Sequence, residues 1–141
     1  RDWPIHLYVE SKRLPEVLPV LLDGGHKVVI PHYGMFDRTL GPLRDPGFKA
    51  LLDSAKTERV WVVMCGAYRV GPERARAATP MLLDAFGPAR LMWGSDWPHT
   101  DTGLDRTKTY PLTLKWFGEW VPDDTVRRTI LIDTPSKLYG F

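Results

Sequence analysis

Ionisable side chains follow four apolar runs of this 141-residue sequence, and their types could support acid–base chemistry. Tyr8, His32, Arg69 and Asp96 each stand at or just after the end of such a run. A carboxylate within hydrogen-bond reach of a water molecule can take its proton, while a histidine can polarise a carbonyl group or bind a metal. An arginine can hold a carboxylate through two parallel hydrogen bonds. These residue types therefore predict chemistry on a small molecule that carries a negative charge.

The run that leads to Asp96 is the most informative of the four. Leu91, Met92 and Trp93 predict a buried strand, and a Gly-Ser pair follows it. Pro98 disfavours a helical backbone for the residue before it, so the chain is expected to turn or extend here. This places the Asp96 carboxylate at the rim of a sheet, where α/β proteins bind ligands. The alternative is an aspartate that only caps a turn.

His32 and Arg69 hold similar positions relative to their own apolar runs. Pro31 is expected to end the hydrogen bonding of the strand before His32, which is either a functional residue or a core histidine bonded to the backbone. Arg69 needs a carboxylate partner, because an unpaired guanidinium at the end of an apolar strand is costly. That partner is either a substrate or a protein group such as Glu10. Both residues are therefore candidates for substrate contact.

Strand alternation assigns the neighbouring side chains to faces. In the run from residue 5 to residue 10, His6 and Tyr8 share one face. Tyr68 has the opposite strand parity to Arg69, so it is expected to pack behind the sheet. Cys65 lies within an apolar run and is interpreted as an inert, buried thiol.

Strand patterns alternate with helix patterns along the chain. Strands are predicted over 5–10, 27–34, 59–69 and 91–93, and helices over 14–22, 46–55, 73–86, 110–120 and 122–131. Ser11 and Asp45 are the expected caps of the first two helices, and a polar loop is expected over 100–108. Alternation of this kind predicts a parallel sheet with right-handed crossovers. The carboxyl ends of its strands, and with them the ionisable residues, then share one edge.

Four strand–helix units make half of a (β/α)8 barrel, which needs roughly 250 residues. The predicted fold class is therefore α/β, with residues 1–141 forming a single domain that is the C-terminal half of a TIM barrel. Four parallel strands alone would expose two edges and a bare inner face. An N-terminal half-barrel or a homo-oligomer is expected to complete the fold.

Charge and hydropathy exclude several classes of protein. The 19 basic and 17 acidic residues give a net charge of +2, and no basic run carries interleaved aromatic residues, so no nucleic-acid partner is expected. No apolar stretch approaches the roughly 20 residues of a membrane helix, so no membrane partner is expected either. The single cysteine excludes an internal disulfide and fits a reducing compartment, which predicts a cytoplasmic protein.

Four short motifs occur in order along the chain: His6-Leu-Tyr8, Pro31-His32-Tyr-Gly34, Cys65-Gly-Ala-Tyr-Arg69 and Gly94-Ser-Asp96-Trp-Pro-His99. In this order they resemble the amidohydrolase superfamily (amidohydrolase-2 type), and within it the lactonase branch that includes the 2-pyrone-4,6-dicarboxylate lactonases. The resemblance covers essentially the whole chain, as strands five to eight of the barrel. It implies a hydrolase that opens a small carboxylated lactone.

The resemblance also implies a role for each site residue. Asp96 matches the general base that acts on the attacking water, and His32 matches a histidine that binds and polarises the reacting carbonyl group. Tyr8 and Arg69 match positions that hold substrate carboxylates, and His6 is a further candidate for substrate binding. At Pro31 and Cys65 the sequence departs from the aspartate and serine that the family often carries.

Metal dependence separates the alternatives within the resemblance. The lactonase branch is expected to require no metal, whereas related zinc-dependent decarboxylases and sugar lactonases imply one divalent ion, zinc or manganese. His32, Asp96 and His6 are the candidate ligands of such an ion. The His-x-His pair that the family carries on its first strand does not occur in this sequence. The remaining alternative is a barrel fragment without catalytic activity.

Overall fold

The computed structural model describes residues 2–99, 107 and 109–141. Within these residues, the centre of the fold is a parallel four-stranded sheet in the order β1-β2-β3-β4. The strands are β1 (Ile5–His6), β2 (Val28–Ile30), β3 (Val60–Met64) and β4 (Leu91–Trp93). The polar loop predicted over 100–108 lies almost entirely outside the described residues.

The described α-helices occupy most of the segments that the sequence pattern predicted. They are α1 (Leu14–Asp23), α2 (Pro46–Ser54), α3 (Ala67–Val70), α4 (Pro72–Phe86), α5 (Tyr110–Trp120), α6 (Asp124–Arg128) and α7 (Thr134–Tyr139). A π-helical turn, Thr129–Asp133, joins α6 to α7. In this part of the chain, no helix combines the length and the apolar character that crossing a membrane requires.

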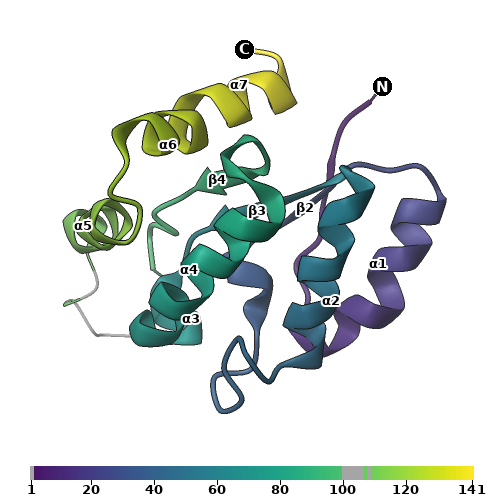
Figure 1. Cartoon of the computed structure of the whole chain (residues 1–141), viewed down its shortest axis with the longest axis horizontal. Coiled ribbons are helices and arrows are strands. Elements are labelled where there is room, and N and C mark those ends of the chain that lie inside the picture. Colours follow the sequence, from purple (N-terminus) through teal and green to yellow (C-terminus); the bar gives the residue numbers. More distant parts are fainter. Residues whose placement is uncertain (1, 100–106, 108) are drawn as a thin grey trace.

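Strand order follows chain order, which confirms the predicted α/β class. A doubly wound sheet would reverse its order at a switch point, whereas an order without reversal is that of a barrel wall. Helix α2 contacts α1 on one side and α4 on the other. Figure 1 shows these three helices side by side along the sheet. The fold is therefore half of a (β/α)8 barrel.

The hydrophobic core lies between the sheet and these helices. Strand pairing brings Val28 beside Val60 and Val62 beside Leu91, and all four side chains are fully buried. They share one cluster with residues of the covering helices, which include Leu14, Leu18, Phe48, Leu51, Ala78 and Leu82. Truncating one such leucine to alanine costs about 2–5 kcal/mol of stability. This core fixes the strands whose ends carry the site.

Asp45 joins three segments at the carboxyl end of the sheet. It caps α2 as predicted, because its Oδ1 accepts the Phe48 N–H at 2.8 Å. Its Oδ2 accepts the Ser11 hydroxyl at 2.7 Å and the Asp37 N–H at 2.6 Å. The prediction that Ser11 caps the first helix is wrong, because the serine hydroxyl is used here. Helix α1 instead starts after Arg13, without a side-chain cap.

The predicted third strand, 59–69, ends five residues early. β3 stops at Met64, and Gly66 adopts a left-handed backbone with φ +58°. That turn starts the short helix α3, which carries Tyr68 and Arg69. Because a helical turn replaces the strand here, side-chain directions no longer alternate with a period of two.

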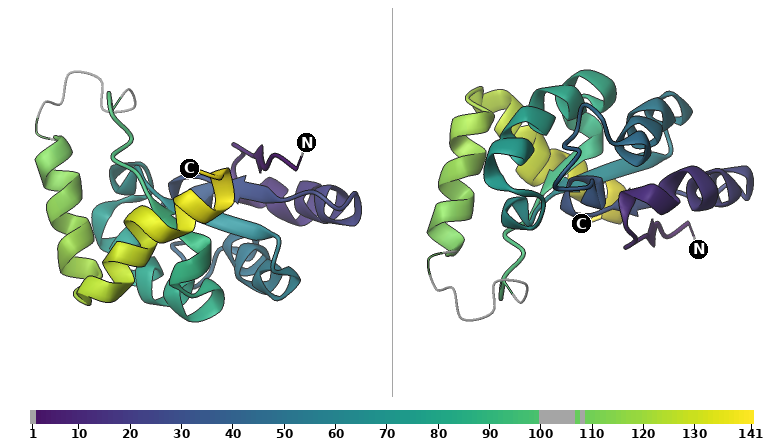
Figure 2. Two further views of the ribbon diagram at one scale, coloured as in Figure 1. Left: turned by 90° about the horizontal axis from the view of Figure 1, so that it is seen from above. Right: turned by 90° about the horizontal axis from the view of Figure 1, so that it is seen from below.

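The C-terminal helix α7 lies at the opposite end of the sheet. The Thr134 hydroxyl donates to the carbonyl oxygen of Pro88, just before β4 starts, at 2.8 Å. Near the other end of α7, the Tyr139 hydroxyl lies 2.8 Å from His6 Nε2 in β1. Figures 1 and 2 show α7 and both chain ends on this side, with α3 and the loop before α2 on the other. Helix α7 therefore crosses the end where the strands begin.

Candidate active site

Three neighbouring strands deliver the candidate site from their carboxyl ends. His32 follows β2, Gly66 follows β3 and Asp96 follows β4. All three have left-handed backbones, with φ of 54°, 58° and 59°. For the two residues other than glycine this conformation is strained, and such strain gathers at functional sites. Three left-handed residues therefore lie together at the carboxyl end of the sheet, where the candidate site is.

Asp96 is the centre of the cluster. Its Oδ2 accepts hydrogen bonds from the Tyr68 hydroxyl and from Arg69 Nε, the latter at 2.6 Å. Its Oδ1 lies 3.8 Å from His32 Nδ1. The side chain is only 15% exposed, so the Arg69 interaction acts in a partly desolvated setting. The structure thus brings Asp96, His32 and Arg69 into one group.

His32 is held on two sides by Cys65 and Tyr8. Its backbone N–H donates to Cys65 Sγ at 3.3 Å, and the same sulfur lies 3.3 Å from Nδ1 of the ring. The Tyr8 ring meets the imidazole edge-on, with centroids 5.2 Å apart. Burial raises the pKa of the Cys65 thiol to about 12. The contact between Cys65 and His32 was missed from the sequence, where Cys65 was interpreted as inert.

Gly66 leaves the space that the cluster needs. A Cβ at this position would lie 2.7 Å from His32 Nδ1, 2.9 Å from Asp96 Oδ2 and 3.0 Å from Arg69 Cδ. Any larger residue would push against three site residues at once. In the sequence, the glycine between Cys65 and Ala67 could have indicated that other residues approach the backbone closely at this point.

Tyr68 contacts the site, and its predicted position behind the sheet is wrong. Helix α3 turns its hydroxyl to the same Asp96 oxygen that Arg69 contacts. Burial, followed by the Asp96 carboxylate, raises the pKa of Tyr68 well above its usual range. The tyrosine therefore stays protonated and donates. On its other side it packs edge-on against the buried ring of His99, at 5.5 Å.

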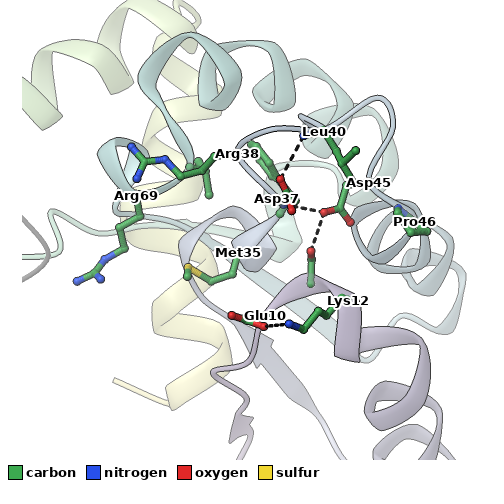
Figure 3. Close-up of a pocket in the computed structure, with 12 residues that line it drawn as sticks. Glu10, Lys12, Met35, Asp37, Arg38, Leu40, Asp45, Pro46 and Arg69 are labelled. Atoms are coloured by element: carbon green, nitrogen blue, oxygen red, sulfur yellow. Dashed lines mark hydrogen bonds and ion pairs between the residues drawn. The ribbon is translucent and has the colours of Figure 1, made fainter.

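Arg69 finds its carboxylate within the protein, at Asp96. Glu10, the other acid considered for this pairing, instead binds Lys12 at 2.6 Å. A cavity of about 410 Å³ adjoins the stem of Arg69, lined also by Met35 and Arg38. Figure 3 shows the Arg69 guanidinium pointing away from the other labelled residues of this cavity.

His6 lies outside this group of side chains. Its exposed ring stacks on Tyr139 of α7, with centroids 5.9 Å apart, at the end of the sheet where the strands begin. Its neighbour on the same face, Tyr8, reaches the other end and contacts His32. The structure therefore separates these two candidate substrate-binding residues.

The described residues do not form a complete metal centre. Among them, no three histidine, cysteine, aspartate or glutamate side chains gather in a group that could hold an ion. His32 Nδ1 faces Cys65, and the Arg69 cation lies 2.6 Å from Asp96 Oδ2. A positive charge at that distance opposes binding of a second cation to the same carboxylate. The candidate ligand set therefore does not fit a divalent ion by itself.

Comparisons with known proteins find relatives that match nearly the whole chain. The chain is 30% identical to a 4-sulfomuconolactone hydrolase from Rhizobium radiobacter, over 99% of this chain and 48% of that protein. It superposes with a TM-score of 0.89, at 31% identity, on the crystal structure of a probable 2-pyrone-4,6-dicarboxylic acid hydrolase from Acinetobacter baumannii with citric acid bound. That match covers 99% of this chain and 53% of the other.

A more distant structure shares the fold alone. An amidohydrolase from Burkholderia multivorans, solved with bound zinc, matches with a TM-score of 0.78 at 22% identity, over 96% of this chain and 52% of the other. The chain spans about half the length of the curated relatives it matches. The family model described as amidohydrolase matches residues 1–141. The chain therefore belongs to the amidohydrolase family.

Proposed function

We propose that this chain supplies the catalytic carboxylate of a lactone hydrolase. One observation carries the proposal: Asp96 is fixed through Oδ2 by Tyr68 and Arg69, while Oδ1 faces His32. A carboxylate held in this way keeps one oxygen to accept a proton from water. It lies at the carboxyl end of barrel strands, where this fold places its chemistry.

The proposed reaction adds water across the ring ester. Asp96 takes one proton from a water molecule as its oxygen attacks the carbonyl carbon, and His32 donates a hydrogen bond to the carbonyl oxygen. The carbon–oxygen bond of the ring then breaks, and the proton on Asp96 passes to the departing alkoxide. The product is the open hydroxy acid. General base catalysis of this kind contributes about 10²–10⁴-fold to the rate.

An anionic group on the substrate fits the residues around Asp96. The guanidinium of Arg69 is a planar fork of N–H donors whose shape suits a carboxylate, and its Nε contact with Asp96 Oδ2 holds it in this group. Tyr8 adds a phenol that is 59% exposed beside His32. The names of the relatives describe lactones that carry sulfonate or carboxylate groups. We therefore assign Arg69 and Tyr8 to binding of such a group.

The reaction is proposed to proceed without a metal. The support is the positive charge of Arg69, 2.6 Å from Asp96 Oδ2, which opposes binding of a metal cation to the same carboxylate. Metal analysis of the purified protein, together with hydrolysis measured before and after chelation, tests this point. Loss of activity on chelation and its return with zinc or manganese would favour the metal-dependent alternative.

Completion of the barrel is proposed to need four more strand–helix units. Trp61 and Val63 lie on the side of β3 that faces away from the buried core and are only half-buried. The relatives are about twice as long as this chain, so a half-barrel like theirs is the expected partner. Sedimentation of the chain alone distinguishes this arrangement from a homo-oligomer. A stable, active monomer would contradict both the partner half-barrel and the homo-oligomer.

Hydrolysis assays test the function itself. The substrates are 2-pyrone-4,6-dicarboxylate, a sulfonated muconolactone and an uncharged lactone of similar size. Each is offered to the chain alone and to the chain with a polypeptide carrying the other half of a relative's barrel. We expect ring opening of the charged lactones in the assembled barrel. Equal rates for the uncharged lactone, or no hydrolysis in any combination, would contradict the proposal.

A further inference from the structure

The Cys65 thiol makes two contacts with a single residue, His32. Its sulfur accepts the His32 backbone N–H at 3.3 Å and lies 3.3 Å from Nδ1 of the same ring. The thiol is buried, and burial raises its pKa to about 12, so it carries its proton at neutral pH. The S–H bond is a weak donor, and Nδ1 is within the distance for a hydrogen bond to sulfur.

The direction of this hydrogen bond is linked to where the imidazole carries its own proton. A neutral imidazole has one N–H and one bare nitrogen, and the hydrogen bond at one nitrogen sets the state of the other. If the thiol donates to Nδ1, then Nδ1 is bare and the proton is on Nε2. Asp96 Oδ1 would favour the opposite form, but it lies 3.8 Å from Nδ1. That distance is too long for a hydrogen bond, so the thiol is the nearer partner.

We propose that Cys65 is a positioning residue that holds His32 as the neutral tautomer protonated on Nε2. The second contact supports this role, because the sulfur also fixes the backbone of His32 in its left-handed conformation. One side chain thus contacts both the ring and the backbone of His32. Nε2 is on the side of the ring away from Cys65, and its N–H is the group that polarises a substrate carbonyl. Only this last step rests on the proposed function.

Nitrogen NMR of the ring tests the tautomer directly. The 141-residue chain is labelled with 15N, and the His32 signals are assigned by their loss in His32→Asn. Protonated and bare ring nitrogens have well-separated shifts. At neutral pH we expect a bare Nδ1 and a protonated Nε2. A wild-type spectrum with the proton on Nδ1 overturns the proposal, and this measurement needs no variant at Cys65.

Two variants at Cys65 separate proton donation from packing. In Cys65→Ala the donor is lost, and we expect signals of the Nδ1-protonated form as the proton turns toward Asp96. In Cys65→Ser a hydroxyl donor is present, and we expect the wild-type pattern to return. An unchanged tautomer in the alanine variant, or a serine variant that behaves like alanine, contradicts the proposal. Amide spectra confirm that each variant is folded.

Activity measurements keep this inference apart from the proposed function. In the assembled barrel, Cys65→Ala should lower kcat with little change in KM, and Cys65→Ser should restore most of it. The predicted tautomer without any lactone hydrolysis would leave the role of Cys65 intact and overturn the proposed function. Hydrolysis by a protein whose His32 carries its proton on Nδ1 would overturn the role of Cys65 and leave the proposed function intact.

Discussion

Two aspartates at the carboxyl end of the sheet are held in contrasting ways. Asp45 is buried and accepts three hydrogen bonds from uncharged donors, two N–H groups and the Ser11 hydroxyl, which involve both of its oxygens. Asp96 is more exposed, and its Oδ2 receives both Tyr68 and the cationic Arg69. Asp45 has an ordinary extended backbone, whereas Asp96 has a φ of 59°.

The difference indicates what each carboxylate does. Asp45 joins Ser11, the loop at Asp37 and helix α2, so its hydrogen bonds stabilise the fold. Asp96 contacts the ionisable side chains of Tyr68 and Arg69, lies 3.8 Å from His32 and has a left-handed backbone. Substitutions at the two sites should therefore affect different measurements.

The largest effect is expected from Gly66→Ala, which crowds Asp96, His32 and Arg69 together. Displacing catalytic groups by about 1 Å can cost on the order of 10²-fold in rate, and three groups move here. We expect kcat to fall by about 10²–10⁴-fold. The matched control is Gly140→Ala, because Gly140 has a left-handed backbone like that of Gly66, with φ 78° and ψ 41°, but no described atom within 4 Å of the new Cβ. Similar losses of activity in both variants would attribute the effect to backbone strain alone.

Asp45→Ala should act on stability. It leaves the buried Phe48 N–H, the buried Ser11 hydroxyl and the partly buried Asp37 N–H without their acceptor, at about 1–3 kcal/mol for each group that water cannot reach. We expect the free energy of unfolding to fall by about 3 kcal/mol in chemical denaturation. Asp123→Ala is the control, because the exposed side chain of this cap of α6 accepts the Val126 N–H at 2.9 Å, and its loss should cost only about 1 kcal/mol. Equal losses of unfolding free energy in the two variants would contradict the structural role of Asp45.

Arg69→Met should weaken binding of charged lactones more than it slows their hydrolysis. Hydrogen bonds to charged groups contribute about 1.5–3 kcal/mol, so KM should rise roughly 10–100-fold. An uncharged lactone should show a much smaller rise. Arg128→Met, an exposed arginine on α6, serves as the control. A rise in KM that is the same for charged and uncharged substrates would argue against an anion site at Arg69.

The smallest effect concerns alkaline pH. Folding raises the pKa of Cys65 from about 9 to about 12, so its thiol ionises more readily in the unfolded chain. The stability linked to this group is therefore full below about pH 9 and is lost as the pH rises toward 12. By about pH 10 the loss should be about 1 kcal/mol relative to Cys65→Ser, which has no ionisable thiol. Parallel stability curves for the two proteins would contradict the burial of this thiol.

The sequence predicted the fold class because apolar runs mark the four strands, three of which carry buried residues. Its four parallel strands and their order followed from the alternation of strands with amphipathic helices. It also predicted that Asp96, His32 and Arg69 would share one edge, because the carboxyl ends of parallel strands do so.

Details of the site depended on turns that local patterns do not reveal. Tyr68 was misplaced because the chain turns at Gly66 and continues as a helix rather than a strand. The contact of Cys65 with His32 depends on two segments 33 residues apart in the sequence. The prediction of Ser11 as a cap used its local sequence only. Its hydroxyl instead donates to Asp45, which is 34 residues away in the sequence.

Turnover by Asp96→Asn tests the central claim most directly. The amide has nearly the same shape and can still accept the Tyr68 hydroxyl, so the fold and substrate binding should be largely unchanged. Its oxygen cannot take a proton from water. We predict that kcat for a charged lactone falls by about 10²–10⁴-fold in the assembled barrel while KM changes little. Turnover at the wild-type rate would contradict the account.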